Sequence, residues 1–151
     1  MVHSVIFLFS FLLLSIVCKG ETSGKAEYVG GTVAQCKAGL DGRLHTSAPG
    51  MVFLSGKTRV EISYDRINLL EYGQNASRRI VMAVLVSPIF LLSKARRHFL
   101  TVGFQDADGK QQALVLRLDK THVRGILASL EARTGLRVQY QDEESRKSGR
   151  G

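Results

Sequence analysis

Alternation of apolar and polar side chains predicts several strands of a β-sheet. The clearest case is residues 58–64, where every second side chain is apolar, as in a strand with one buried face. Residues 99–104 and 113–118 follow the same pattern. Asp106-Ala107-Asp108-Gly109 lies between these two runs. An Asp-Gly step at this place predicts a hairpin, because glycine accepts the positive φ of a tight turn.

Shorter apolar runs predict the remaining strands. The Gly30-Gly31 pair predicts either a bulge in the first strand or a close approach of two backbones. Ser47-Ala48-Pro49-Gly50 has the composition of a turn. Residues 136–140 are expected to add a short extended segment. The runs themselves cover residues 28–33, 43–46, 51–54 and 67–72.

One amphipathic helix is predicted near the C-terminus, over residues 119–134. We expect Asp119 to cap its first turn by accepting backbone N–H bonds. Gly135 is expected to take the left-handed position after its last turn, with Leu136 making the accompanying apolar contact. The apolar stripe at positions i, i+3, i+4 and i+7 consists of Val123, Ile126, Leu127 and Leu130.

These elements predict an α+β fold. It is a curved antiparallel sheet, or partly open barrel, of about seven strands, closed by the one C-terminal amphipathic helix. A chain of 151 residues is long enough for one such domain and too short for two. We expect the domain to span residues 28–140, after a polar linker at residues 21–27. Residues 141–151 contain no apolar side chain to bury and are expected to form a disordered tail.

The first twenty residues predict export. Val5 to Val17 is an apolar stretch interrupted only by two serines, and Cys18-Lys19-Gly20 follows it. This pattern is typical of a secretory signal peptide cleaved before Glu21. Two alternatives stay open, namely an uncleaved membrane anchor formed by residues 5–17 and lipid attachment at Cys18. In each case the expected location is periplasmic or extracellular.

The chain is basic, with 21 Lys and Arg against 13 Asp and Glu, a formal charge of +8. Such an excess predicts attraction to anionic partners, and export favours lipid headgroups, acidic polymers or a protein over nucleic acid. If Cys18 leaves with the signal peptide, Cys36 is the only cysteine and no internal disulfide can form. We therefore expect Cys36 to be a small buried apolar residue.

A candidate contact surface lies between Glu71 and Asp106, where the chain has no acidic residue. The apolar run Ile80–Leu92 is bracketed there by cations, and Pro88 makes a single long helix within it improbable. One interpretation is a projection that contacts an anionic membrane surface or a protein partner, including a second copy of the chain. The alternative is a core strand or buried hairpin whose cations mark its exit into water. The candidate contact residues are Arg78, Arg79, Ile80, Val84, Leu85, Ile89, Phe90, Leu91, Lys94, Arg96 and Arg97.

The sequence shows no catalytic or cofactor motif. It has no Gly-x-Ser-x-Gly elbow, no phosphate-binding glycine loop and no zinc-protease pair. His45, His98 and His122 are not spaced with other ligands as a metal site requires. We therefore expect a protein that is not an enzyme and that has no cofactor, metal or small-molecule substrate.

Three segments resemble bacterial pleckstrin-homology-like (GRAM-like) domains. Val60-Glu61-Ile62-Ser63-Tyr64-Asp65-Arg66-Ile67, continuing to Gly73, is similar to their mid-barrel strand pair. The His98–Val102 strand, the Asp108-Gly109-Lys110 turn and the helix to Gly135 are similar to the last hairpin and closing helix of small exported proteins of this type. The resemblance covers Tyr28 to Tyr140 and implies a domain that binds lipids, peptides or proteins. Residues 35–46 contain only two cations, Lys37 and Arg43, so phosphoinositide binding is not implied.

Overall fold

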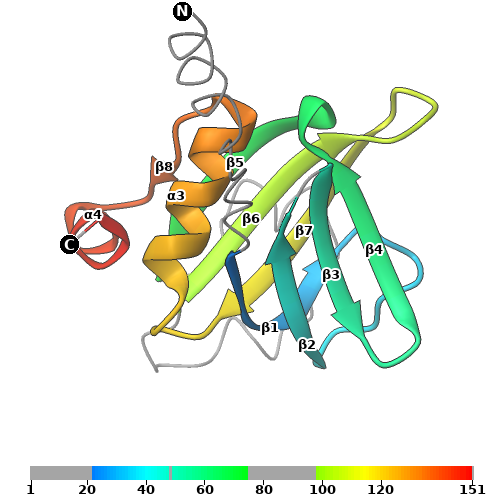
Figure 1. The fold of residues 1–151 in the computed structure, drawn as a ribbon, viewed down its shortest axis with the longest axis horizontal. Coiled ribbons are helices and arrows are strands. Elements are labelled where there is room, and N and C mark those ends of the chain that lie inside the picture. The colour runs from blue at the N-terminus through cyan, green and yellow to red at the C-terminus, as the bar shows by residue number, and fades with distance from the viewer. Residues whose placement is uncertain (1–21, 48, 75–97, 151) are drawn as a thin grey trace, which may run out of the picture.

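A computed structural model describes residues 22–47, 49–74 and 98–150 (Figure 1). Its main feature is a curved, unclosed eight-stranded sheet, antiparallel except for its last pair, in the order β4-β3-β2-β1-β7-β6-β5-β8. The fold is α+β, as the sequence predicts. The strands are β1 (Thr22–Gly31), β2 (Leu40–Thr46), β3 (Gly50–Ser55), β4 (Thr58–Ser63), β5 (Ile67–Gly73), β6 (His98–Gln105), β7 (Gln111–Leu118) and β8 (Gln139–Tyr140). The helices in these ranges are the short 3-10 helix η2 (Tyr64–Arg66), α3 (Val123–Thr134) and α4 (Glu143–Arg150).

The alternating runs form strands where the sequence predicts them. In β4, Val60 and Ile62 are buried whereas Arg59 and Glu61 are exposed. The β6–β7 hairpin turns at Gly109, which has a φ of 76°. The predicted extended segment after the helix contains β8, which pairs in parallel with β5 and is the eighth strand.

The Asp106 carboxylate stabilises the β6–β7 turn. Its Oδ1 accepts the backbone N–H of Asp108 at 3.0 Å and that of Lys110 at 2.9 Å. Its Oδ2 accepts a hydrogen bond from the Gln112 side chain at 2.7 Å. These hydrogen bonds lower the pKa of Asp106, and the bond from Gln112 has the largest effect. This carboxylate is therefore engaged within its own hairpin.

The predicted linker is wrong, because residues 22–26 belong to β1. Thr22 pairs with Thr46 of β2, and Ala26 lies between Gly42 of β2 and Leu118 of β7. The segment has a linker's composition because α3 crosses β1 closely here. A Cβ on Gly24 would lie 2.6 Å from the Cβ of His122, so only glycine fits at this position. Further along β1, the register against β7 shifts between Tyr28 and Gly30, which is the bulge that the glycine pair predicts.

Helix α3 covers one face of the sheet with the predicted stripe. All four stripe residues are at most 2% exposed, and Figure 1 shows the helix lying across the strands. The hydroxyl of Thr46 in β2 donates to that of Ser129 at 2.8 Å, which joins helix to sheet. After the helix, Gly135 has a φ of 73° and donates its N–H to the carbonyl of Glu131. The predicted end of the helix is confirmed.

The predicted start of the helix is wrong by four residues. The Asp119 carboxylate accepts the N–H of Thr121 at 2.8 Å, and the Asp119 carbonyl accepts the N–H of His122. Asp119 therefore caps the turn that leads into α3, and the helix itself begins at Val123. Hydrogen bonds from Thr121 lower the pKa of the Asp119 carboxyl group.

The predicted disordered tail is also wrong, because most of it forms α4. Asp142 accepts the N–H of Ser145 at 2.6 Å, which caps the first turn and lowers the pKa of Asp142. Ser145 and Gly149 are the buried residues of α4. A Cβ on Gly149 would lie 2.6 Å from the ring of Tyr140, so a small residue permits the contact. The helix therefore packs through small residues, and a search for apolar side chains does not detect it.

Both faces of the central strands are buried. The core under α3 includes Phe53, Leu100, Leu116 and Ile126, together with Cys36, which is buried as the sequence predicts. Alternate side chains of the same strands point to the opposite face. Five apolar side chains on that face are also buried, although they lie outside the core cluster: Val29, Val52, Phe99, Ala113 and Val115.

Candidate functional site

The eleven predicted contact residues all lie within residues 75–97, outside the described part of the chain. They are Arg78, Arg79, Ile80, Val84, Leu85, Ile89, Phe90, Leu91, Lys94, Arg96 and Arg97. The N-terminal segment, residues 1–20, lies outside it as well. The described residues do define the place from which the 75–97 segment starts and to which it returns. We call this place the base of the segment: the end of β5, the start of β6 and the residues of α4 beside them.

The two ends of the 75–97 segment are attached to neighbouring strands. Strand β5 ends at Gly73 and β6 begins at His98, and Gly73 pairs with Phe99 across the antiparallel ladder. Paired strands lie about 4.8 Å apart. The segment therefore leaves and re-enters the sheet at one point.

A cluster of hydrogen-bonded side chains holds the base together. The Tyr72 hydroxyl of β5 is bonded to Nδ1 of His98 in β6 and lies 3.2 Å from the hydroxyl of Ser148 in α4. The rings of Tyr72 and His98 stack at 6.0 Å, and Tyr140 meets Tyr72 edge-on at 5.9 Å. Three elements are thus joined at one fully buried tyrosine.

Burial sets the protonation of this cluster. It raises the pKa of Tyr72, so the phenol stays protonated at neutral pH. It also lowers the pKa of His98, helped by the charge of Lys120 and opposed by that of Asp119. Both shifts favour the uncharged forms of Tyr72 and His98, and the five cations nearby in sequence belong to the 75–97 segment.

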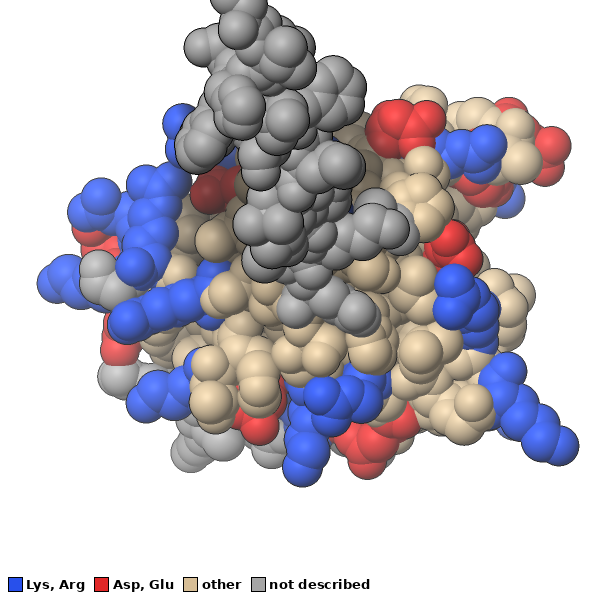
Figure 2. All heavy atoms as spheres, viewed as in Figure 1, with Lys and Arg blue, Asp and Glu red and all other residues tan. Residues whose placement is uncertain are grey.

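The net charge of the chain is concentrated in that segment. Residues 75–97 contain five Lys and Arg and no Asp or Glu, which is +5 of the total +8. Elsewhere the charges are mixed, and on the face in Figure 2 cations and carboxylates are interspersed. In α4, for example, Arg146 pairs with Glu143 at 2.5 Å and Arg150 lies 3.8 Å from Glu131.

A second candidate, an open groove of about 720 Å³, is lined chiefly by β1, β2 and the end of β3, with Arg117 of β7. Its charged side chains are three cations and three carboxylates, so their formal charges cancel. Glu27, only 7% exposed, is paired there with Arg117. The groove is therefore a poor site for an anion. The six charged residues are Lys25, Glu27, Asp41, Arg43, Arg117 and Asp119.

No family model matches the chain, and no curated protein matches it. Within the described ranges, no group of three or more His, Cys, Asp and Glu side chains is placed to hold a metal ion. In the same ranges, neither α3 nor α4 is long and apolar enough to cross a membrane.

Two features of this region were not predicted. The Glu27–Arg117 pair joins β1 to β7, and the Tyr72–His98–Ser148 cluster joins β5, β6 and α4. In both, the partners are far apart in sequence. No local spacing signals them, because strand pairing and, for Ser148, the packing of α4 bring the side chains together.

Proposed function

We propose that this chain is an exported, non-enzymatic module that binds an anionic membrane surface through residues 78–97. In this proposal the sheet, which begins with β1 at Thr22, and α3 form a pleckstrin-homology-like scaffold that holds the segment at the paired ends of β5 and β6. The observation that carries the proposal is the attachment of the segment. The segment that carries the apolar run and its five cations follows the end of β5 and precedes the start of β6, where Gly73 pairs with Phe99.

Chain length alone keeps these cations near that point. An extended chain spans at most about 3.6 Å per residue. Lys94, four residues before His98, is therefore held within about 14 Å of β6. Arg79, six residues after Gly73, is held within about 22 Å of β5. Both basic flanks can thus act on the same patch of surface.

The charge and the apolar run supply complementary parts of the affinity. Each Lys or Arg near an anionic leaflet contributes about 1 kcal/mol, so five contribute about 5 kcal/mol when all face the lipid. The run Ile80–Leu92 is too short to cross a bilayer, which requires about 20 residues. It can instead bury its tip at the boundary between headgroups and acyl chains.

The architecture supports the scaffold part of the proposal. The curved sheet with α3 across one face has the outline implied by the resemblance to pleckstrin-homology-like domains. Members of that superfold bind lipids, peptides or proteins. Phosphoinositide specificity is not part of our proposal, because the described groove over β1 and β2 is lined by as many carboxylates as cations.

Vesicle co-sedimentation of the purified wild-type chain tests the proposal. We expect the protein to pellet with phosphatidylcholine vesicles that contain phosphatidylglycerol and to remain in solution with pure phosphatidylcholine. Raising the salt concentration should reduce binding, because screening shortens the reach of the cations. Equal partition onto both vesicle types, or binding that salt does not change, would contradict the proposal. A stable dimer without lipid affinity would favour the alternative, in which the same segment docks on a protein.

A further inference from the structure

The two edges of the sheet, which we call its rims, differ in how far their backbone groups are hydrogen-bonded. At one rim, β8 pairs with β5, and Gln141 donates its N–H to the carbonyl of Tyr72 and its side-chain amide to Glu71. At the other rim, β4 pairs with β3, and no described strand lies on its far side. Figure 1 shows β4 at the margin of the sheet. Its C-terminal half borders a hollow of about 410 Å³ lined by Glu61, Ile62 and Ser63.

Strand β4 lacks most of the features that usually protect a sheet edge from pairing, although two of its six side chains are charged. Such edges commonly carry proline, lysine, a bulge or an inward-pointing charge. The sequence Thr-Arg-Val-Glu-Ile-Ser contains neither proline nor lysine, and its pairing with β3 runs without a register shift. The inward side chains, Val60 and Ile62, are apolar and buried. Its only charges, Arg59 and Glu61, have opposite signs.

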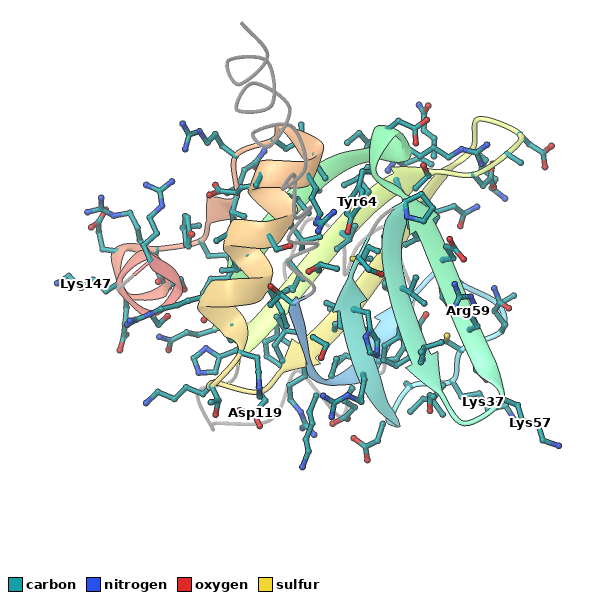
Figure 3. All side chains as sticks on the ribbon, viewed as in Figure 1. Lys37, Lys57, Arg59, Tyr64, Asp119 and Lys147 are labelled. Atoms are coloured by element: carbon teal, nitrogen blue, oxygen red, sulfur yellow. The ribbon has the colours of Figure 1, made fainter. Side chains whose placement is uncertain are left out.

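The backbone of β4 has groups available for another strand. The two-residue turn Gly56–Lys57 makes Ser55 and Thr58 a hydrogen-bonded pair, and hydrogen-bonded pairs then alternate along the ladder. Arg59, Glu61 and Ser63 therefore direct their N–H and C=O groups away from β3. Figure 3 shows Arg59 on β4 and Lys57 at the tip of its hairpin.

The charges of β4 select one partner and one register. We propose that β4 pairs antiparallel with β4 of a second copy of this chain, about a two-fold axis at Val60. In this register Arg59 lies opposite Glu61 of the second copy, and Glu61 opposite its Arg59, so both contacts are attractive. A shift that centres the pair on Arg59 or on Glu61 places like charges opposite each other. Within one chain Arg59 and Glu61 pair with each other, and their side chains are 56% and 42% exposed. Each can therefore exchange this partner for the oppositely charged residue of the second copy.

This inference is independent of the membrane proposal, because it uses a different surface. If both proposals hold, a dimer presents two basic segments, which increases avidity when both reach the membrane.

A charge-swap series tests the dimer. Sedimentation velocity should give the wild-type chain twice the mass of one 16.6 kDa chain. Arg59→Glu or Glu61→Arg alone turns two attractive contacts into two repulsive ones and should raise the dimer Kd by about 10- to 100-fold. The double swap Arg59→Glu/Glu61→Arg restores opposite charges in the same register and should restore the dimer. The wild type and the three variants have the same N-terminal residues, so any association through these residues is the same in all four proteins.

A backbone variant distinguishes pairing through β4 from a general charge effect. Glu61→Pro removes an outward N–H and is tolerated at an unpaired edge, so the variant should fold and be monomeric. Circular dichroism checks that each variant is folded. A monomeric wild type would overturn the proposal. It would also be overturned by a dimer that survives all the substitutions, or by a double swap that stays monomeric.

Discussion

Replacing Lys94, Arg96 and Arg97 by Gln is expected to weaken binding to anionic vesicles by about 100-fold. Each of these cations should contribute about 1 kcal/mol at an anionic surface. A loss of about 3 kcal/mol corresponds to roughly two orders of magnitude in affinity. The measurement is the partition coefficient from co-sedimentation at low salt over a series of vesicle concentrations.

A matched control removes the same charge elsewhere. Lys37, Lys57 and Lys110 are exposed and lie in loops of the described sheet. Their replacement by Gln changes the net charge by the same amount, from +8 to +5. We expect this variant to bind almost as the wild type does. If both variants lose affinity equally, binding depends on overall charge and the 75–97 segment has no special role.

Replacing Arg117 by Met is expected to destabilise the fold by about 3 kcal/mol. Glu27 is nearly buried, and its partner Arg117 is 29% exposed at the side chain. Removing one member of a buried ion pair leaves an uncompensated charge, which typically costs 3–5 kcal/mol. The partial exposure of Arg117 places the expected value near about 3 kcal/mol, at the low end of that range. Urea unfolding followed by circular dichroism measures the change.

Two further variants separate charge from packing. Glu27→Gln/Arg117→Met removes both charges and should recover all but about 1 kcal/mol of the stability. Arg59→Met breaks an exposed pair of the same residue types and should change stability by less than about 1 kcal/mol. A loss in the double variant as large as that in Arg117→Met would show that Arg117 stabilises the sheet by packing instead.

Sequence periodicity predicts the elements whose burial follows a simple period. The strand β4 and the stripe of α3 are in this class, because one apolar face alternates with one polar face. The sequence predicts the second half of β1 as a strand but its first half, residues 22–27, as a linker, because the close approach of His122 and Ile126 requires a residue as small as Gly24 there. Helix α4 was missed because its contact with Tyr140 uses Gly149, although Asp142 followed by two glutamates was a readable helix start.

The candidate site was predictable only in part. Its composition, an apolar run between cations, is a local property and is visible in the sequence. That both flanks are anchored at one point depends on the pairing of Gly73 with Phe99, which is a long-range contact. The neutral Tyr72–His98–Ser148 cluster depends on three separate elements for the same reason.

The most direct test of the membrane proposal uses a fluorescent probe in the apolar run. The chain contains no tryptophan, so Phe90→Trp introduces a single reporter. Lys57→Trp, in the exposed β3–β4 turn, is the control. We predict that the emission of Phe90→Trp shifts to shorter wavelength on addition of anionic vesicles and is quenched by brominated acyl chains, whereas that of Lys57→Trp is unchanged. Emission of Phe90→Trp that is already at short wavelength without lipid, and does not respond to vesicles, would show that the run is buried in the protein and would contradict the proposal.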